Sequence, residues 1–181
     1  MALLTIVQQN LYKPISQNWA NHTKISGGYT NFEQLQAEVE NTDLKKLIGP
    51  AFLYAIQQTP TDVNYVKLLD GIDFEDCDGN TIEFKGIRYQ LAFINYSRYV
   101  GKSDQADTFT GMVRQNRSET SPLSEGAIKR ERHDAESIAM QDFEIMKQYL
   151  NDNTEVYTLW CVGNTKKIFT PKLTTIRKTY N

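Results

Sequence analysis

The segment GIRYQLAFINYSRYVGKS, residues 86–103, carries the clearest helical pattern in the chain. Its apolar side chains form two adjacent stripes at spacings of three and four: Ile87, Leu91 and Ile94, then Tyr89, Phe93 and Tyr96. A helix that is apolar on nearly every side is usually central, so we expect this segment in the middle of the fold. The two arginines within it, Arg88 and Arg98, are expected to extend toward water or to pair with acids.

Two helical runs are expected before the central helix. Thr30 or Asn31 is a typical N-cap for a helix over residues 32–41. The stretch DLKKLIGPAFLYAIQQ, residues 43–58, predicts a second run. Because proline removes a backbone donor and clashes with the preceding turn, Gly49-Pro50 should kink this run or divide it into two short helices.

A short helix and a hairpin are expected next. Residues 61–71 predict a helix that Gly71 ends, with three apolar residues on one face: Val63, Val66 and Leu69. In residues 72–84 the period changes, because apolar residues alternate with acids around Asp78-Gly79. That pattern predicts a β-hairpin.

The longest predicted helix starts at Ser124 and runs to about Asn153. We expect a seam of Ile128, Ala135, Ile138, Ile145 and Tyr149, with Ala139, Phe143, Met146 and Leu150 beside it. The helix would be about 40 Å long at 1.5 Å per residue, which is more than a small core covers. The sequence YTLW, residues 157–160, is expected to pack back on the bundle through Tyr157, Leu159 and Trp160.

These patterns predict a mainly α protein: a small helical bundle with one long C-terminal helix, a short β-hairpin and extended arms. Residues 1–30 are interpreted as an irregular N-terminal arm, with a short strand possible in LLTIV, residues 3–7. Residues 31–160 form the helical domain, and residues 161–181 a basic C-terminal arm. Among the 181 residues, 40% are hydrophobic and 23% charged, which is typical of one soluble domain.

The sequence offers little that resembles an active site. Its two cysteines suggest neither a disulfide framework nor a metal cluster, and His22 and His133 lack neighbours at metal-ligand spacing. The acids near Asp78 do not have the spacing of a calcium loop, and no glycine-rich phosphate loop occurs. No apolar run reaches membrane-spanning length, and residues 1–12 do not read as a signal peptide. We therefore expect a non-enzymatic protein without a cofactor or metal, made in a reducing cytoplasm.

A long polar connection, residues 103–122, separates the central helix from the long one. Connections of this length are usually functional or disordered. Its middle, TGMVRQN, has the alternation of a strand that lies on a partner. The candidate contact residues of this loop are Asp107, Phe109, Met112, Arg114, Gln115 and Arg117.

The C-terminal arm is basic whereas the rest of the chain is acidic. From Thr165 onward there are five basic residues and no acid, while the other residues hold 15 basic and 22 acidic side chains, a net charge of −7. The arm and the body therefore attract each other, within one chain or between copies. The candidate contact residues of the arm are Lys166, Lys167, Phe169, Lys172, Arg177 and Lys178.

Four pieces in order carry a resemblance to a known family: LIGPAFLYAI; YVKLLDG leading into the hairpin and the aromatic helix; the polar connection before the long helix; and YTLW. Over residues 43–160 this order resembles head–tail connector proteins of tailed bacteriophages, especially Bacteroidetes and crAss-like phages. No short motif in it is diagnostic. The N-terminal arm and the basic tail fall outside the resemblance.

The resemblance implies a structural virion protein at the head–tail junction. Copies would form a ring, typically twelve-fold, beneath the portal protein, where they would extend the DNA channel and meet further connector or tail proteins. In such a ring Arg114 and Arg117 either face passing DNA or pair with acids of the next subunit. The alternatives are another structural phage protein, for tail completion or a head fibre, and a helical DNA-binding module. IKRER at residues 128–132 is the one candidate recognition run, and acids surround it.

The loop interpretation makes a prediction. Deletion of residues 106–120 should preserve helical content in circular dichroism and block assembly into rings or particles. Loss of the helical signal in the deletion variant would show that the segment belongs to the core instead.

Overall fold

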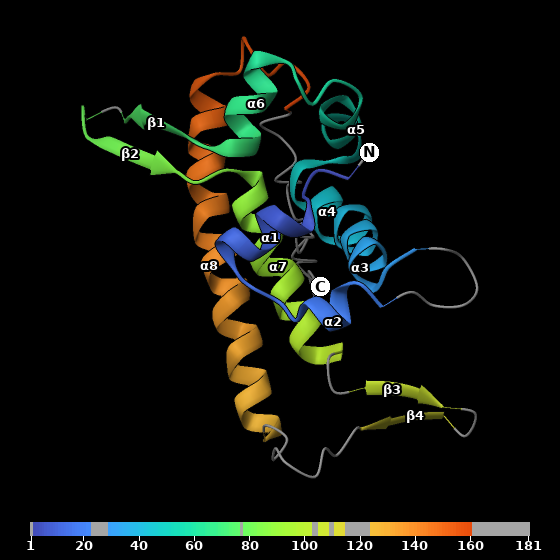
Figure 1. Cartoon of the computed structure of the whole chain (residues 1–181). Coiled ribbons are helices and arrows are strands. Elements are labelled where there is room, and N and C mark those ends of the chain that lie inside the picture. Colours follow the sequence, from blue (N-terminus) through green and yellow to red (C-terminus); the bar gives the residue numbers. More distant parts are fainter. Residues whose placement is uncertain are drawn as a thin grey trace, which may run out of the picture.

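A computed structural model describes residues 2–22, 29–76, 78–102, 105–108, 111–114 and 124–160. The fold is mainly α, with a long C-terminal helix and a short hairpin, as the sequence predicted. Helix α7, Ile87–Lys102, runs through the middle of the molecule, and α8, Glu125–Asp152, packs along its length (Figure 1). The shorter helices gather on the other side of α7.

The central position of α7 is confirmed. Its core face includes Leu91 and Ala92, both fully buried, and it also buries three polar side chains: Gln90, Asn95 and Ser97. The predicted arginine pairs are confirmed too. Arg88 forms an ion pair with Asp70, and Arg98 Nη2 lies 2.9 Å from a carboxylate oxygen of Asp43.

Helix α8 has the predicted bounds, and the hydroxyl of Ser124 caps it by accepting from the amide of Ala127. Its buried face differs in part from the predicted seam, because Ile138 is 37% exposed. The core side is formed by Ala135, Ala139, Asp142, Phe143, Met146, Tyr149 and Leu150. The spacing of apolar residues in α8 allows either of two neighbouring stripes to be buried. Packing against α7 determines which of them is. The turns before Ala135 project beyond the core, as expected of so long a helix.

The first predicted helical runs form one connected path. Helix α3, Asn31–Val39, begins with a capping box between Thr30 and Glu33. It continues through a π-helical turn, η1, Glu40–Leu44, into α4, Lys45–Ile48, so the predicted gap near residue 42 is wrong. The predicted break at Gly49-Pro50 is confirmed. Gly49 has φ 86°, and Pro50 starts α5, Pro50–Gln58.

The N-terminal segment is not an irregular arm. It contains α1, Ile6–Tyr12, and α2, Gln17–Ala20, and the predicted strand at LLTIV is wrong. Four of its apolar residues belong to the core: Leu3, Leu4, Ile15 and Ala20. The sequence pattern did not indicate that this segment belongs to the core, because the two helices are short and α1 buries a polar residue.

Helix α6, Val63–Asp70, ends at Gly71 as predicted and leads into strand β1, Ile72–Glu75, which pairs antiparallel with β2, Thr81–Phe84. The hairpin is therefore confirmed. The predicted face of α6 is wrong for two of its residues, because Val63 is 69% and Val66 38% exposed. Leu68 and Leu69 supply the buried side.

The chain after α8 turns back onto the bundle, as predicted. Tyr157 and Trp160 are buried, and both rings lie against Phe52 of α5, with ring centroids 6.2 and 6.0 Å apart. Leu159, which was expected to share this contact, is 46% exposed.

Part of the polar connection at residues 103–122 forms its own hairpin. Strand β3, Gln105–Thr108, pairs antiparallel with β4, Gly111–Arg114. The alternating pattern predicted a strand correctly, but the strand pairs within the chain. The hairpin lies beyond the C-terminal end of α7, away from β1 and β2 (Figure 1).

Gly79 and Gly86 both have positive φ, but only Gly86 is also crowded by neighbouring atoms. Substituting each by alanine therefore measures the cost of backbone strain with and without crowding. Gly86 has φ +95°, and a Cβ there would come within 2.6 Å of the amide nitrogen of Gly71. Gly79 has φ +80° but nothing within 4 Å of such a Cβ. We expect Gly79→Ala to lower the free energy of unfolding by about 1 kcal/mol, and Gly86→Ala by about 3 kcal/mol, since strain and overpacking add. Urea unfolding of both variants measures the difference; equal losses would contradict the close approach at Gly86.

Candidate assembly surfaces

A buried chain of hydrogen bonds joins α1, α7, α3 and η1. The Nδ2 of Asn95 donates to Gln36 Oε1 at 2.5 Å and to Gln9 Oε1 at 3.2 Å. Gln36 in turn donates to the carboxylate of Glu40 at 2.5 Å. All four side chains are at most 4% exposed. Buried polar groups are stable only when they are hydrogen-bonded, so this network specifies how the four elements meet.

The carboxylate of Glu40 accepts from three donors and forms no ion pair with a cation of the described residues. Besides Gln36, it accepts from the backbone amide of Leu3 at 2.7 Å and from Gln57 Nε2 at 2.8 Å. The π-helical turn places this residue where Leu3 and α5 both reach it. The N-terminal segment is therefore tied to the body by hydrogen bonds as well as by apolar packing.

Helix α1 buries one polar residue and exposes two apolar ones, while its Ile6 and Tyr12 pack partly against the core. Gln9 is fully buried and donates to the carbonyl oxygens of Ala92, at 2.9 Å, and Lys13, at 2.7 Å. Val7 and Leu11, one turn apart, are 76% and 77% exposed. We call Val7 and Leu11 the α1 patch. The two exposed apolar side chains make α1 a candidate contact surface.

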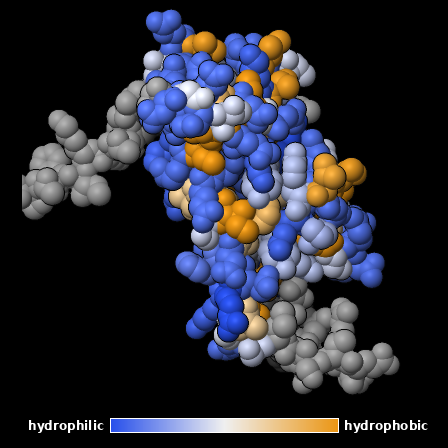
Figure 2. Space-filling model, turned by 90° about the vertical axis from the view of Figure 1, so that its left-hand side faces the viewer, coloured by the Kyte–Doolittle hydropathy of each residue, from blue (hydrophilic) through white to orange (hydrophobic). Residues whose placement is uncertain are grey.

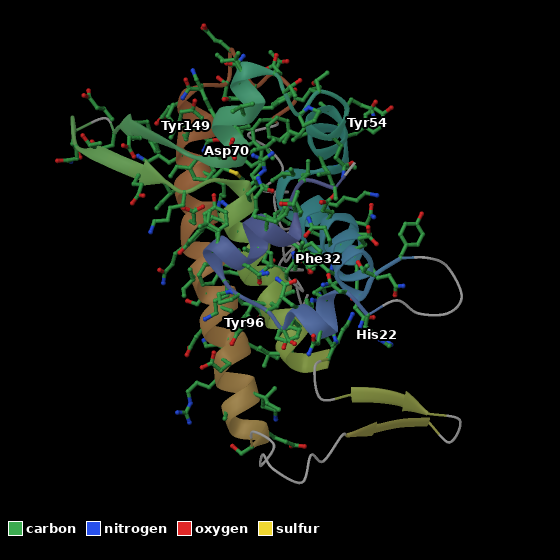
Figure 3. The ribbon with its side chains drawn as sticks, viewed as in Figure 1. His22, Phe32, Tyr54, Asp70, Tyr96 and Tyr149 are labelled. Atoms are coloured by element: carbon green, nitrogen blue, oxygen red, sulfur yellow. The ribbon has the colours of Figure 1, made fainter. Side chains whose placement is uncertain are left out.

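A second group of exposed apolar residues lies at the end of the molecule formed by α6 and the chain after α8 (Figure 1). It consists of Val63 and Val66 on α6 and Val156 and Leu159 after α8, here called the cap patch. The two segments meet where the hydroxyl of Tyr157 donates to the carbonyl of Asn64 at 3.1 Å. Tyr54, on the outward side of α5, is 64% exposed near the same end (Figure 3).

A cluster of aromatic side chains lies next to the cap patch. The ring of Tyr157 lies between Phe52 and Tyr149, and its hydroxyl is 3.4 Å from that of Tyr149. Burial raises the pKa of Tyr157, and the hydrogen bond with Tyr149 raises it further. Trp160 Nε1 donates to Asn151 at 2.9 Å, which fixes the last described residue. The residues of the cap patch are therefore attached to a well-packed, hydrogen-bonded part of the core.

The β1–β2 hairpin has one apolar face and one acidic face. Phe74 and Phe84 lie against Tyr149, with centroid distances of 5.2 and 6.4 Å. On the other face Asp73 is directly opposite Glu83, and such like-charge pairs are destabilising. Asp76 closes the turn, and its pKa is lowered, mainly by the hydrogen bond from the Asn80 amide. The acidic face suits a basic partner.

Asp142 fixes the hairpin to α8. Its carboxylate is 5% exposed and accepts from the amide of Lys85 at 3.0 Å and from Gln90 Nε2 at 2.9 Å. Burial raises the pKa of this carboxyl, although the two hydrogen bonds oppose the shift. The other amide atom of Gln90, Oε1, is buried without a partner.

The structure places only some of the predicted contact residues. Asp107 and Met112 face each other across β3 and β4, and Arg114 is opposite Gln105 at the base of that hairpin. Phe109, Gln115 and Arg117 lie outside the described residues, as do all six predicted contacts of the C-terminal arm: Lys166, Lys167, Phe169, Lys172, Arg177 and Lys178.

Residues of both apolar patches were missed as surface residues from the sequence. Val7 lies in a run that reads as a strand, and Val63 and Val66 have core-like spacing. A polar Gln9 between two apolar residues of α1 was the one available signal. Of the histidines, His22 and His133 are both exposed, and within the described ranges no three His, Cys, Asp or Glu side chains gather to hold a metal ion. None of the described helices is long and apolar enough to cross a membrane.

Taken together, these features define a small helical protein with two exposed apolar patches and an acidic hairpin. The chain belongs to a family of unknown function, DUF6712, whose model matches residues 44–170. The match includes the start of the basic arm and leaves out α1 to α3. No curated protein and no solved structure matches the chain.

The environment of Asp142 predicts a pH effect. Because its pKa is raised on folding, the folded state holds the proton more tightly, so the free energy of unfolding falls as pH rises above about 4. Asp142→Asn removes this titration, and Gln90 can turn its unpaired Oε1 toward the new amide. We expect the variant to gain stability relative to the wild type between about pH 4 and pH 7.

Asp142→Ala serves as the matched control. It leaves the Lys85 amide and Gln90 without their acceptor, so we expect a loss of about 2 kcal/mol at neutral pH. Urea unfolding across the pH range measures all three proteins. Parallel curves for the wild type and Asp142→Asn would contradict the raised pKa.

Proposed function

We propose that this chain is a structural virion protein, a head–tail connector that forms a ring below the portal of a tailed bacteriophage. The ring extends the DNA channel and joins the capsid to the tail. The order of helices and hairpin that resembles the connector family supports this proposal. The structural observation that supports the proposal most directly is the presence of two separate apolar patches, the α1 patch and the cap patch.

Two unlike contact faces are what a ring requires. In a cyclic ring each subunit meets its neighbours through heterologous contacts, so one face of a copy binds a different face of the next. The α1 patch and the cap patch lie on different elements at separate places on the surface. A two-fold dimer would instead use one self-complementary face.

Charge supports a role for the arm in the same assembly. The acidic face of the β1–β2 hairpin carries Asp73, Glu75 and Glu83, and the C-terminal arm is basic throughout. A basic segment laid along an exposed hairpin of a neighbour adds both main-chain and ionic contacts. The twelve-fold number and the place beneath the portal come from the family resemblance alone.

Another structural phage role, in tail completion or a head fibre, would use the same patches with a different partner. The partner therefore decides between these roles. The oligomeric state of the protein, alone and mixed with a portal protein, measured by sedimentation velocity and electron microscopy, tests the proposal. A ring that forms on the portal is the expected result, and a stable monomer that ignores the portal contradicts it.

The α1 patch gives a sharper form of this test. Because Val7 and Leu11 are mostly exposed, the double change to serine should alter the free energy of unfolding by less than about 0.5 kcal/mol. It should nevertheless prevent ring formation on the portal. Met140→Ser, on an exposed part of α8 outside both patches, is the control and should assemble normally. Normal assembly of the double variant would exclude α1 as an assembly face.

A further inference from the structure

A cavity on α8 is not explained by the assembly surfaces. Among the described residues, it is lined by Lys129, Arg132, His133 and Glu136, all charged or polar. Their spacing of three, four and seven residues puts them on one face of the helix. The cavity is open to solvent and has a volume of about 160 Å³. One water needs only about 15 Å³ on the same scale, so a tetrahedral anion fits.

Within the described residues, the cations of this cavity form no ion pair with a carboxylate. Four other basic residues do, as in Lys102 with Glu38 and Lys147 with Glu144. Neither Lys129 nor Arg132 forms an ion pair with another residue in the part of the chain that the structure describes. The carboxylate of the cavity, Glu136, accepts from the hydroxyl of Ser97 at 2.6 Å. The two cations outnumber this one carboxylate, so the described lining carries net positive charge.

Packing rather than pairing holds the side chain of Arg132. It lies against Gly101 in the last turn of α7, where its Cδ, Cζ and Nη1 atoms are 3.6–3.7 Å from the place of a Cβ. Its Nε is buried and has no hydrogen-bond partner among the described residues. This packing fixes the stem, and Arg132 is one of the residues that line the open cavity.

The surroundings fit an anion of modest size. Tyr96 lies on α7 beside the lower half of α8, and its hydroxyl is 3.4 Å from Glu131, so that carboxylate is engaged outside the cavity (Figure 3). On the face of the molecule formed by α8, the lower part over its first turns is mostly hydrophilic (Figure 2). A polar, cationic and accessible cavity favours a charged ligand over an apolar one.

We infer that this cavity binds a phosphate group. The guanidinium of Arg132 is the fork that matches two phosphate oxygens, and Lys129 adds a second, mobile charge. His133 donates from a ring nitrogen at the rim. The phosphate belongs either to the backbone of DNA or to a free phosphate ion, and both present the same oxygens. The inference stands on the cavity and does not depend on the proposed ring.

The test uses the full-length protein and two probes at fixed ionic strength. Inorganic phosphate is titrated by calorimetry, and a fluorescent duplex of mixed sequence by anisotropy. Arg132→Gln should weaken binding about tenfold or more, since it removes a charge-assisted hydrogen-bond pair. Arg130→Gln is the matched control, because it removes the same charge from an exposed neighbour that does not line the cavity. That control should change affinity by less than about twofold.

The outcomes distinguish the two sources of phosphate. If the wild type binds both probes and Arg132→Gln loses both, the ligand is a backbone phosphate. If the wild type binds inorganic phosphate but not the duplex, and Arg132→Gln loses phosphate binding, the ligand is the free ion. Equal weakening by the variants at 130 and 132 would mean diffuse surface charge and overturn the site, as would no binding of either probe. If Arg132→Gln does not fold, Arg132→Lys keeps charge and stem but loses the fork, and the same loss of affinity is expected.

Discussion

The hydrogen bonds of Asn95 and Glu40 are the constraint on which the arrangement of this protein depends. Asn95 stands in the middle of the most buried helix, where an unpaired amide would be costly. Gln9 and Gln36 satisfy its donor group from two different elements. Glu40 then continues the network to the amide of Leu3 and to α5. The Oδ1 of Asn95 is buried without a partner among the described residues. A shift of any of these elements by one residue would leave further buried polar atoms unsatisfied, so the network favours one packing.

The sequence predicted the elements whose patterns are local. The two apolar stripes of residues 86–103 suffice to place α7 in the core, and Ser124, Gly71 and Gly49-Pro50 mark helix ends by their own backbone chemistry. The Asp78-Gly79 turn does the same for the hairpin. These signals depend on a residue's neighbours along the chain, and the structure agrees with each of them.

Features that depend on distant partners could not be predicted in the same way. Contact with α7 decides which apolar stripe of α8 is buried. Spacing alone therefore could not show that Met146 is more buried than Ile138. The π-helical turn at Glu40 exists in the context of Leu3 and Gln57, which lie 37 and 17 residues away in sequence. Lys129 and Arg132 look like part of an ordinary charged run until the position of Gly101 shows why they border a cavity.

Helix α1 links the internal constraint to the surface. Its buried side combines the hydrogen bonds of Gln9 with the partly buried apolar side chains of Ile6 and Tyr12, which pack against the core. Val7 and Leu11 on the same helix stay exposed. Residues 1–43 lie outside the family match, yet Leu3 and Leu4 complete the core of this chain. The segment is therefore part of the folded body, and the same hydrogen bonds fix the orientation of its exposed residues Val7 and Leu11.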